Sequence, residues 1–340
     1  MSIQVISFEE ALKMSGDRRH LLLGNGFSIS WKADIFRYDS LYNRANFDSL
    51  NPDIKKVFEQ LKTTDFEIVM KSLLSTAEIL KVYCTNETVL ISKLENDATQ
   101  LKNLLVETIA TYHPEAPNEI TEPQYINSNN FLSKFNNIYT LNYDLLLYWV
   151  IMHFNEPNKK PKFDDGFRTP DEGRTEYVTW DVENTNSQNI FYLHGALHIF
   201  DEGAELQKYT WVNTGIKLID QIRSALNKNY FPVFVSEGSS KDKIEKINHS
   251  NYLSRGYRSF SAISHSLFIY GHSLAENDEH ILKLIPKGKI SYLFISLYGD
   301  QNKPDNKKII AKAKSLQETR KNKNKPLELH FFDAQSIEIW

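Results

Sequence analysis

The chain has 340 residues, 41% of them hydrophobic and 24% charged, so it can bury a large core, and these values exclude a disordered or fibrous protein. The formal net charge of −3, in which acidic residues nearly balance Lys and Arg, argues against a general polyanion binder. Cys84 is the one cysteine, which excludes an intrachain disulfide and a zinc site built from several cysteines.

Short apolar runs recur along the chain, and each is followed by small or polar residues. The first run, residues 20–23, leads into a turn that contains two glycines. Apolar runs that alternate with helical patterns are typical of buried strands in a parallel sheet covered on both faces. The sequence therefore predicts an α/β fold with a mostly parallel sheet and helices on both faces. The other predicted strands are residues 138–141, 190–193, 232–235, 266–270, 292–297 and 327–332.

A glycine-free segment, residues 51–114, interrupts this alternation and carries apolar residues at helical spacing. The pattern predicts two or three long helices that form an inserted helical lobe. We therefore divide the chain into a helical insertion, residues 51–124, and an α/β domain of residues 1–50 and 125–340. The polar stretch of residues 155–189 predicts a long surface excursion.

Residues 303–325 hold nine Lys or Arg residues against two acidic ones. Ile309, Ile310, Ala313 and Leu316 would form one apolar stripe, which favours a solvated helix packed beside the last strand. A nucleic-acid contact has weaker support, because no aromatic residues lie between the lysines. We therefore expect no nucleic-acid substrate.

Small and polar residues follow five of the predicted strands. In a doubly wound sheet, ligands bind outside the carboxyl ends of the strands, so we expect these residues to form a ligand site. Gly24 and Gly26 would let the backbone approach a ligand closely, and the helix that follows offers free amides to a phosphate. Ile29 stands where the dinucleotide fingerprint requires a third glycine, which argues against an ordinary Rossmann dehydrogenase.

These turns together resemble the motifs of the sirtuin (Sir2) family, in the order that the family has them. The resemblance covers roughly residues 18–40 and 130–300 and leaves out the helical insertion. The matching segments are Gly24-Asn25-Gly26-Phe27-Ser28, Phe36-Arg37, Thr140-Leu141-Asn142-Tyr143-Asp144, Leu193-His194-Gly195, Pro232-Val233-Phe234-Val235 with Glu237, and Gly271-His272-Ser273-Leu274.

The resemblance implies a Rossmann-like cleft that binds NAD as a substrate and cleaves the bond between nicotinamide and ribose. Asn142 and His194 would be catalytic, because the amide can hold ribose hydroxyls and water while the imidazole accepts a proton. Asp144 would orient the nicotinamide amide. The other residues that would contact NAD are Gly24, Asn25, Gly26, Ser28, Phe36, Arg37, Glu237, Gly271 and Ser273.

Two departures from the sirtuins narrow this expectation. The four-cysteine zinc module of the protein deacylases is missing, and the spacing from Asn142 to His194 is much longer than in those enzymes. Both features are similar to the SIR2-like domains of bacterial antiphage systems, which hydrolyse NAD to ADP-ribose and nicotinamide, and the chain also resembles the bacterial DUF4917 family. The resemblance therefore implies an NAD⁺ glycohydrolase that uses water as acceptor and needs no metal.

Other functions remain open at this point: a module that senses NAD or ADP-ribose without cleaving it, and a zinc-less protein deacylase or ADP-ribosyltransferase. Asn142 is also typical of a helix N-cap, and His194 of a buried core histidine. The resemblance suggests a homo-oligomer and a regulatory partner such as a defence-system ATPase. Residues 1–14 lack the apolar core of a secretion signal and no run of 18 apolar residues occurs, so we expect a cytoplasmic protein without a membrane span.

Overall fold

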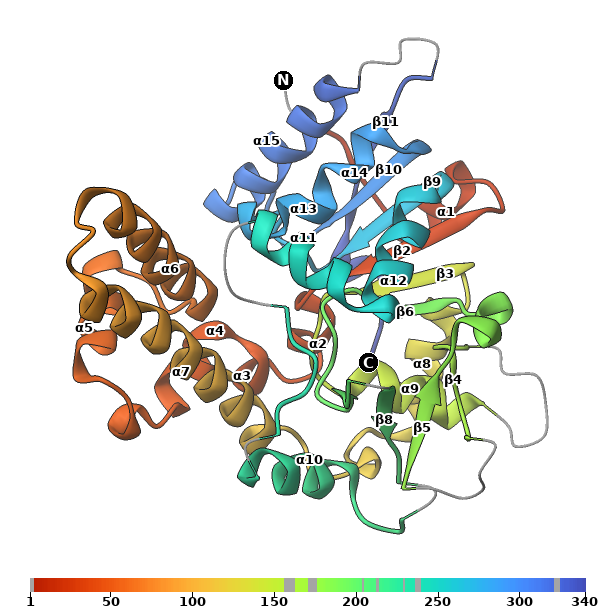
Figure 1. Cartoon of the computed structure of the whole chain (residues 1–340). Coiled ribbons are helices and arrows are strands. Elements are labelled where there is room, and N and C mark those ends of the chain that lie inside the picture. The colour runs from red at the N-terminus through yellow and green to blue at the C-terminus, as the bar shows by residue number, and fades with distance from the viewer. Residues whose placement is uncertain are drawn as a thin grey trace.

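A seven-stranded parallel sheet forms the centre of the computed structural model (Figure 1). The strands lie in the order β1-β11-β10-β9-β2-β3-β6, and every neighbouring pair is parallel. Their bounds are β1 (Val5–Ile6), β2 (Arg19–Leu23), β3 (Asn137–Thr140), β6 (Ile190–Tyr192), β9 (Ser264–Tyr270), β10 (Lys289–Leu297) and β11 (Glu328–Asp333). The structure describes residues 3–155, 163–170, 176–203, 205–211, 214–228, 230–235, 240–320 and 325–340.

Side chains alternate between the two faces of the sheet, as the strand period requires. Leu21 and Leu23 of β2 pack in one core cluster, whereas Leu22 packs in a second cluster on the opposite face. Both faces are buried, so the predicted α/β class with a Rossmann-like parallel sheet is confirmed. The first cluster includes α1 (Phe8–Met14), α8 (Glu122–Leu132) and α9 (Leu146–Phe154), and the second includes α12 (Asn251–Ala262), α13 (Glu279–Leu282), α14 (Leu284–Lys287) and α15 (Pro304–Thr319).

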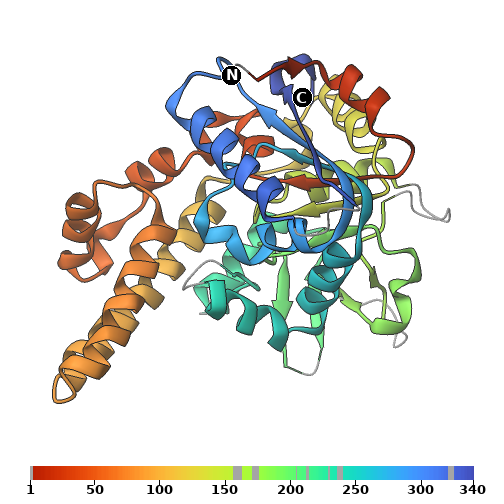
Figure 2. The same cartoon turned by 90° about the horizontal axis from the view of Figure 1, so that it is seen from above.

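Three helices occupy the glycine-free segment and extend away from the sheet (Figures 1 and 2). They are α5 (Pro52–Leu61), α6 (Phe66–Tyr83) and α7 (Thr88–Tyr112), so the predicted helices are confirmed. Asp65 begins α6 by accepting backbone hydrogen bonds from the first turn. The division of the chain into two domains stays a prediction. In the described part of the chain, no helix combines the length and apolarity that crossing a membrane requires.

The predicted surface excursion is partly structured and partly buried, so that interpretation was wrong for part of its length. Four short antiparallel strands form a second sheet in the order β4-β5-β8-β7. Asp164 and Asp165 are buried beside it and pair with Arg168 and Lys208. The strands are β4 (Phe167–Arg168), β5 (Tyr177–Trp180), β7 (Ile199–Asp201) and β8 (Leu206–Tyr209).

One predicted strand, residues 232–235, was wrong. Phe234 forms only an isolated antiparallel bridge with Gly195, because this segment crosses the turn after the edge strand β6 and does not extend the sheet. Strand β1 was missed, since two residues are too short to show an alternating pattern. The remaining helices are α2 (Gly26–Ile29), α3 (Ala33–Phe36), α4 (Tyr38–Arg44), α10 (Leu218–Asn227) and α11 (Ser240–His249), with 3₁₀ turns at Phe47–Ser49, Pro117–Glu119, Val182–Ser187, Glu276–Asp278 (η4) and Ala334–Ser336.

Candidate active site at the carboxyl ends of the strands

The order of the strands reverses between β2 and β9. From β2 the chain continues to β3 and β6 on one side, and later returns to add β9, β10 and β11 on the other side. The register pairs Leu23 with both Thr140 and Tyr270, and Thr140 with Tyr192. The turns after β2, β3, β6 and β9 therefore leave the same edge of the sheet at the same level. In folds of this class, the reversal point is where ligands bind.

The glycine turn after β2 packs directly against the turn after β9. The Gly26 amide donates a hydrogen bond of 2.7 Å to the Gly271 carbonyl oxygen. A Cβ atom on Gly24 would lie 2.6 Å from that oxygen, and a Cβ atom on Gly26 would lie 2.5 Å from the Gly271 Cα. Gly271 itself has a φ of +67°. This backbone crossing by itself requires glycine at all three positions, whereas the sequence alone indicated close approach to a ligand.

Ser28, Asn142 and Asp144 form one buried hydrogen-bonded group. Asn142 Nδ2 donates to Ser28 Oγ at 3.2 Å, and Ser28 Oγ donates to Asp144 Oδ2 at 2.5 Å. Burial raises the pKa of the Asp144 carboxyl, and the hydrogen bond from Ser28 opposes that shift. Asp144 Oδ1 also accepts the Leu146 amide at 2.9 Å, so it is Asp144 and not Asn142 that bonds the backbone at the start of α9.

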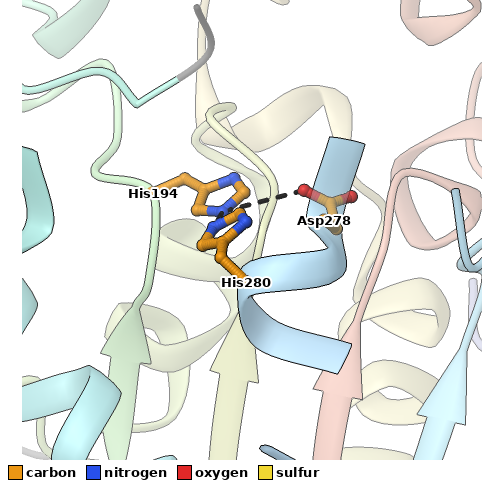
Figure 3. A group of neighbouring side chains, drawn as sticks. All are labelled: His194, Asp278 and His280. Atoms are coloured by element: carbon orange, nitrogen blue, oxygen red, sulfur yellow. Dashed lines mark hydrogen bonds and ion pairs between the residues drawn. The ribbon is translucent and has the colours of Figure 1, made fainter. Parts of the chain in front are cut away.

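His194 lies in the turn after β6 and faces His280 and Asp278 (Figure 3). The Nε2 atoms of the two histidines are 2.9 Å apart, and His194 Nε2 is 3.8 Å from Asp278 Oδ1. The other carboxylate oxygen of Asp278 bonds His272 Nε2 at 2.9 Å, while His272 Nδ1 accepts the Leu274 amide. Since Nδ1 is the acceptor, Nε2 of His272 carries the hydrogen and donates it to Asp278.

Burial sets the protonation of this histidine cluster, which we define as His194, His272, Asp278 and His280. It lowers the pKa of His194 well below its usual value and that of His280 to about 4, so both rings are neutral at pH 7. Burial would raise the pKa of Asp278, but the hydrogen bond from His272 and the Lys243 ammonium lower it below its usual range. The cluster therefore contains a carboxylate beside the neutral imidazoles of His194 and His280.

The two predicted catalytic residues occupy equivalent places on neighbouring strands. Asn142 and His194 each stand two residues beyond the paired positions Thr140 and Tyr192. Tyr143 lies between their turns, with its ring centroid 6.2 Å from that of His194. The fold thus brings the amide and the imidazole to adjacent turns at one edge, as the sequence pattern indicated.

The remaining predicted residues have mixed placements. Asn25 Nδ2 donates to the Phe36 carbonyl oxygen at 2.7 Å, so it fastens the first turn to the segment that carries Phe36. Phe36 is buried, whereas Arg37 is exposed and pairs with Asp39 at 3.2 Å. Ser273 is exposed at the turn after β9. Glu237 lies outside the described residues.

His280 and Asp278 were not predicted from the sequence as neighbours of His194. Lys243 was missed as well; its Nζ lies 3.8 Å from Asp278 Oδ1. Asp278 lies six positions and His280 eight positions after His272, which stands in the turn after β9. Two histidines and an acidic residue so close to a predicted strand end were the available signal for this cluster.

The protein has a Rossmann-like α/β fold. Its parallel sheet is covered on both faces and carries polar turns at its carboxyl edge. The model of the domain of unknown function DUF4917 matches residues 21–340, and the chain belongs to this family. No curated protein matches it.

Among solved structures, similar chains include two mutant Sir2 homologues. One, in complex with 2′-O-acetyl ADP ribose, is 12% identical and has a TM-score of 0.31, with 93% of this chain and 98% of that chain covered. The other, in complex with ADP ribose, is 15% identical and has a TM-score of 0.31, with 92% and 96% covered. A TM-score of 0.31 is too low for these matches to bear on fold or function.

Proposed function

We propose that this protein is an NAD⁺ glycohydrolase that converts NAD⁺ and water into ADP-ribose, nicotinamide and a proton. The observation that carries the proposal is the placement of Asn142 and His194 on adjacent turns beside the reversal point of the sheet. Their segments also match the sirtuin motifs in sequence. Ser28 and Asp144, which match the same motifs, share a hydrogen-bonded group with Asn142.

The residue types suit the bond that would be broken. When nicotinamide leaves, the ribose develops oxocarbenium character, and water then adds to the anomeric carbon and releases a proton. His194 is neutral because burial lowers its pKa, so its imidazole can accept that proton. Asn142 donates through Nδ2 to Ser28, and its Oδ1 is the acceptor that we assign to a ribose hydroxyl. Gly24, Gly26, Gly271 and Ser273 would border the diphosphate and its ribose.

The proposal includes a regulated role in cytoplasmic defence against bacteriophage. Constant hydrolysis of NAD⁺ would harm the cell, so the activity needs a control. The helical insertion, residues 51–124, and the basic helix within residues 303–325 are our candidates for self-association or for contact with a regulatory protein such as an ATPase.

A second candidate function is an NAD or ADP-ribose sensor that binds without cleavage. It is favoured by the lowered pKa of His194, because burial makes this imidazole a weak base for proton transfer. A protein deacylase or ADP-ribosyltransferase would use the same residues but would require a peptide or protein acceptor.

Nicotinamide release from NAD⁺ by the purified full chain tests the proposal. We expect hydrolysis that needs no acceptor and falls at least about 100-fold in Asn142→Ala and His194→Ala, since a positioned acid or base contributes typically 100-fold or more. His249→Ala, at an exposed histidine, is the matched control and should keep full activity. Undiminished turnover in both site variants would refute the proposed site. Tight NAD binding in calorimetry without any product would favour the sensor.

A further inference from the structure

Three potential ligand atoms of the histidine cluster converge on one point. Nε2 of His194, Nε2 of His280 and a carboxylate oxygen of Asp278 all lie within 4.8 Å of one another. The two imidazole rings are nearly parallel, at 15°, with centroids 5.0 Å apart and Nε2 atoms 2.9 Å apart. The nitrogens therefore lie on the facing sides of the rings, as Figure 3 shows. Ligands of one Zn²⁺ ion, each about 2.0–2.2 Å from the metal, stand roughly 3–4 Å from one another.

A shared proton accounts for the two histidines but not for the carboxylate. One Nε2 can donate to the other across 2.9 Å. Asp278 Oδ1, however, lies 3.8 Å from His194 Nε2 and 3.8 Å from Lys243 Nζ, and both distances are too long for direct hydrogen bonds. A carboxylate oxygen that lies within 4.8 Å of two imidazole nitrogens suits a cation held between them.

The surroundings hold these ligands in place as metal sites require. His272 donates through Nε2 to the second oxygen of Asp278, and the Leu274 amide fixes the tautomer of His272. Such hydrogen bonds from outside the ligand set orient a coordinating carboxylate. Lys243 opposes a cation electrostatically, but its Nζ is hydrogen-bonded to Glu67 Oε2 at 2.9 Å, which offsets its charge.

We propose that His194, His280 and Asp278 form a binding site for a divalent transition metal, with Zn²⁺ as the ion that fits best. Two imidazole nitrogens and one carboxylate oxygen are the ligand types and number of an open zinc site, with a fourth position left for water or a small ligand. Ca²⁺ and Mg²⁺ fit less well, because both prefer ligand sets made of oxygen. The sequence did not indicate this metal site. His194 lies in the turn after β6, whereas Asp278 and His280 lie in a helical segment far along the chain, so the three residues form no sequence motif.

One consequence rests on the proposed function. A metal bound to His194 Nε2 occupies the lone pair that would accept the proton, so Zn²⁺ would inhibit NAD⁺ cleavage. Binding of the metal itself does not depend on that activity. The two claims can therefore fail separately.

Metal binding is tested by titrating chelator-treated full-length protein with Co²⁺ and, in calorimetry, with Zn²⁺. We expect one ion per chain and a visible Co²⁺ absorption band for the wild-type chain. His280→Phe keeps a ring and Asp278→Asn keeps the shape of the side chain, and each should weaken binding at least about 10-fold, as the loss even of supporting groups around a metal does. The exposed His249→Ala variant should bind as the wild type does.

Thermal unfolding of the metal-free variants shows which of them fold. If His280→Phe does not fold, the Asp278→Asn variant provides the test of metal binding. The proposal is overturned if the wild-type chain shows neither a heat of Zn²⁺ binding in calorimetry nor a Co²⁺ absorption band. Equal affinity in the wild type and in a folded site variant overturns it as well. Nicotinamide release measured with and without Zn²⁺ then tests inhibition, while the binding data stand whether or not any NAD⁺ is cleaved.

Discussion

Glu67 on α6 and Lys243 on α11 form a buried ion pair, with 2.9 Å between Oε2 and Nζ. Lys243 also faces Asp278 Oδ1 at 3.8 Å. One ammonium group thus lies between a carboxylate of the helical insertion and a carboxylate of the histidine cluster. The helical insertion is therefore linked electrostatically to the proposed site.

Lys243→Met should destabilise the protein by about 3–5 kcal/mol, because it leaves the Glu67 carboxylate buried without its cation. The free energy of unfolding in urea measures this loss. The double variant Glu67→Leu with Lys243→Met should recover part of it, since it removes the unpaired Glu67 carboxylate but leaves Asp278 without the nearby ammonium. A single variant within about 0.5 kcal/mol of the wild type would contradict the assignment.

Gly26→Ala should cost about 1–3 kcal/mol, because its Cβ would lie 2.5 Å from the Gly271 Cα and would force the two turns apart. Gly203→Ala is the contrasting variant: Gly203 has a φ of +78° but no atom within 4 Å of an added Cβ, whereas Gly26 lies in helix α2 and its φ is not positive. The Gly203→Ala variant should show the cost of backbone conformation alone, about 1–2 kcal/mol. Chemical denaturation compares the two. In addition, only Gly26→Ala should disturb NAD⁺ cleavage, because only Gly26 borders the site.

Ser28→Ala removes the hydroxyl that accepts from Asn142 and donates to Asp144. We expect a loss of about 1–3 kcal/mol in stability, because the buried Asp144 carboxyl loses a donor. Nicotinamide release should fall by less than in Asn142→Ala, since the amide remains present but is less well positioned. A larger loss of turnover in Ser28→Ala than in Asn142→Ala would argue against our assignment of the roles.

The pH dependence of stability should show the effect of buried histidines. Burial lowers the pKa of His20 from 6.5 to about 4. The unfolded chain therefore binds a proton near pH 6.5 that the native chain binds only near pH 4, so stability is lost as the pH falls through this window. One group with this shift accounts for roughly 3 kcal/mol between those limits.

His20→Phe should reduce the slope of the stability profile between pH 4 and 6.5, while other buried histidines such as His280 keep part of it. Urea unfolding at several pH values measures it. His249→Phe, at an exposed histidine, serves as the control and should keep the wild-type slope. If His20→Phe and the wild type show the same dependence of stability on pH, His20 has the same pKa in the folded and the unfolded chain.

The sequence allowed most of the central sheet to be predicted, because buried parallel strands are short apolar runs bounded by turns. Residues 20–23 and 266–270 were recognised in this way, and both correspond to observed strands. Residues 232–235 have the same apolar character but make only an isolated bridge. Apolar composition reports burial, and it does not report which neighbour supplies the backbone hydrogen bonds.

The candidate site could be predicted only where its residues directly follow strands. Asn142 and His194 were singled out because they follow predicted strands and because their segments resemble sirtuin motifs; their catalytic roles stay a prediction. His280 lies on the short helix α13 and Lys243 on α11, and neither position follows a strand. Their approach to His194 depends on how these helices pack over the sheet, which local patterns do not encode.

The crossing of the two glycine turns limits how a dinucleotide could be held. The Gly26 amide points at the Gly271 carbonyl and is saturated by it. It therefore has no free hydrogen to offer to a diphosphate, and the four-residue helix α2 that begins there cannot act as an anion cradle through this group. A nucleotide bound at these turns would therefore have to take its phosphate contacts from groups other than the Gly26 amide.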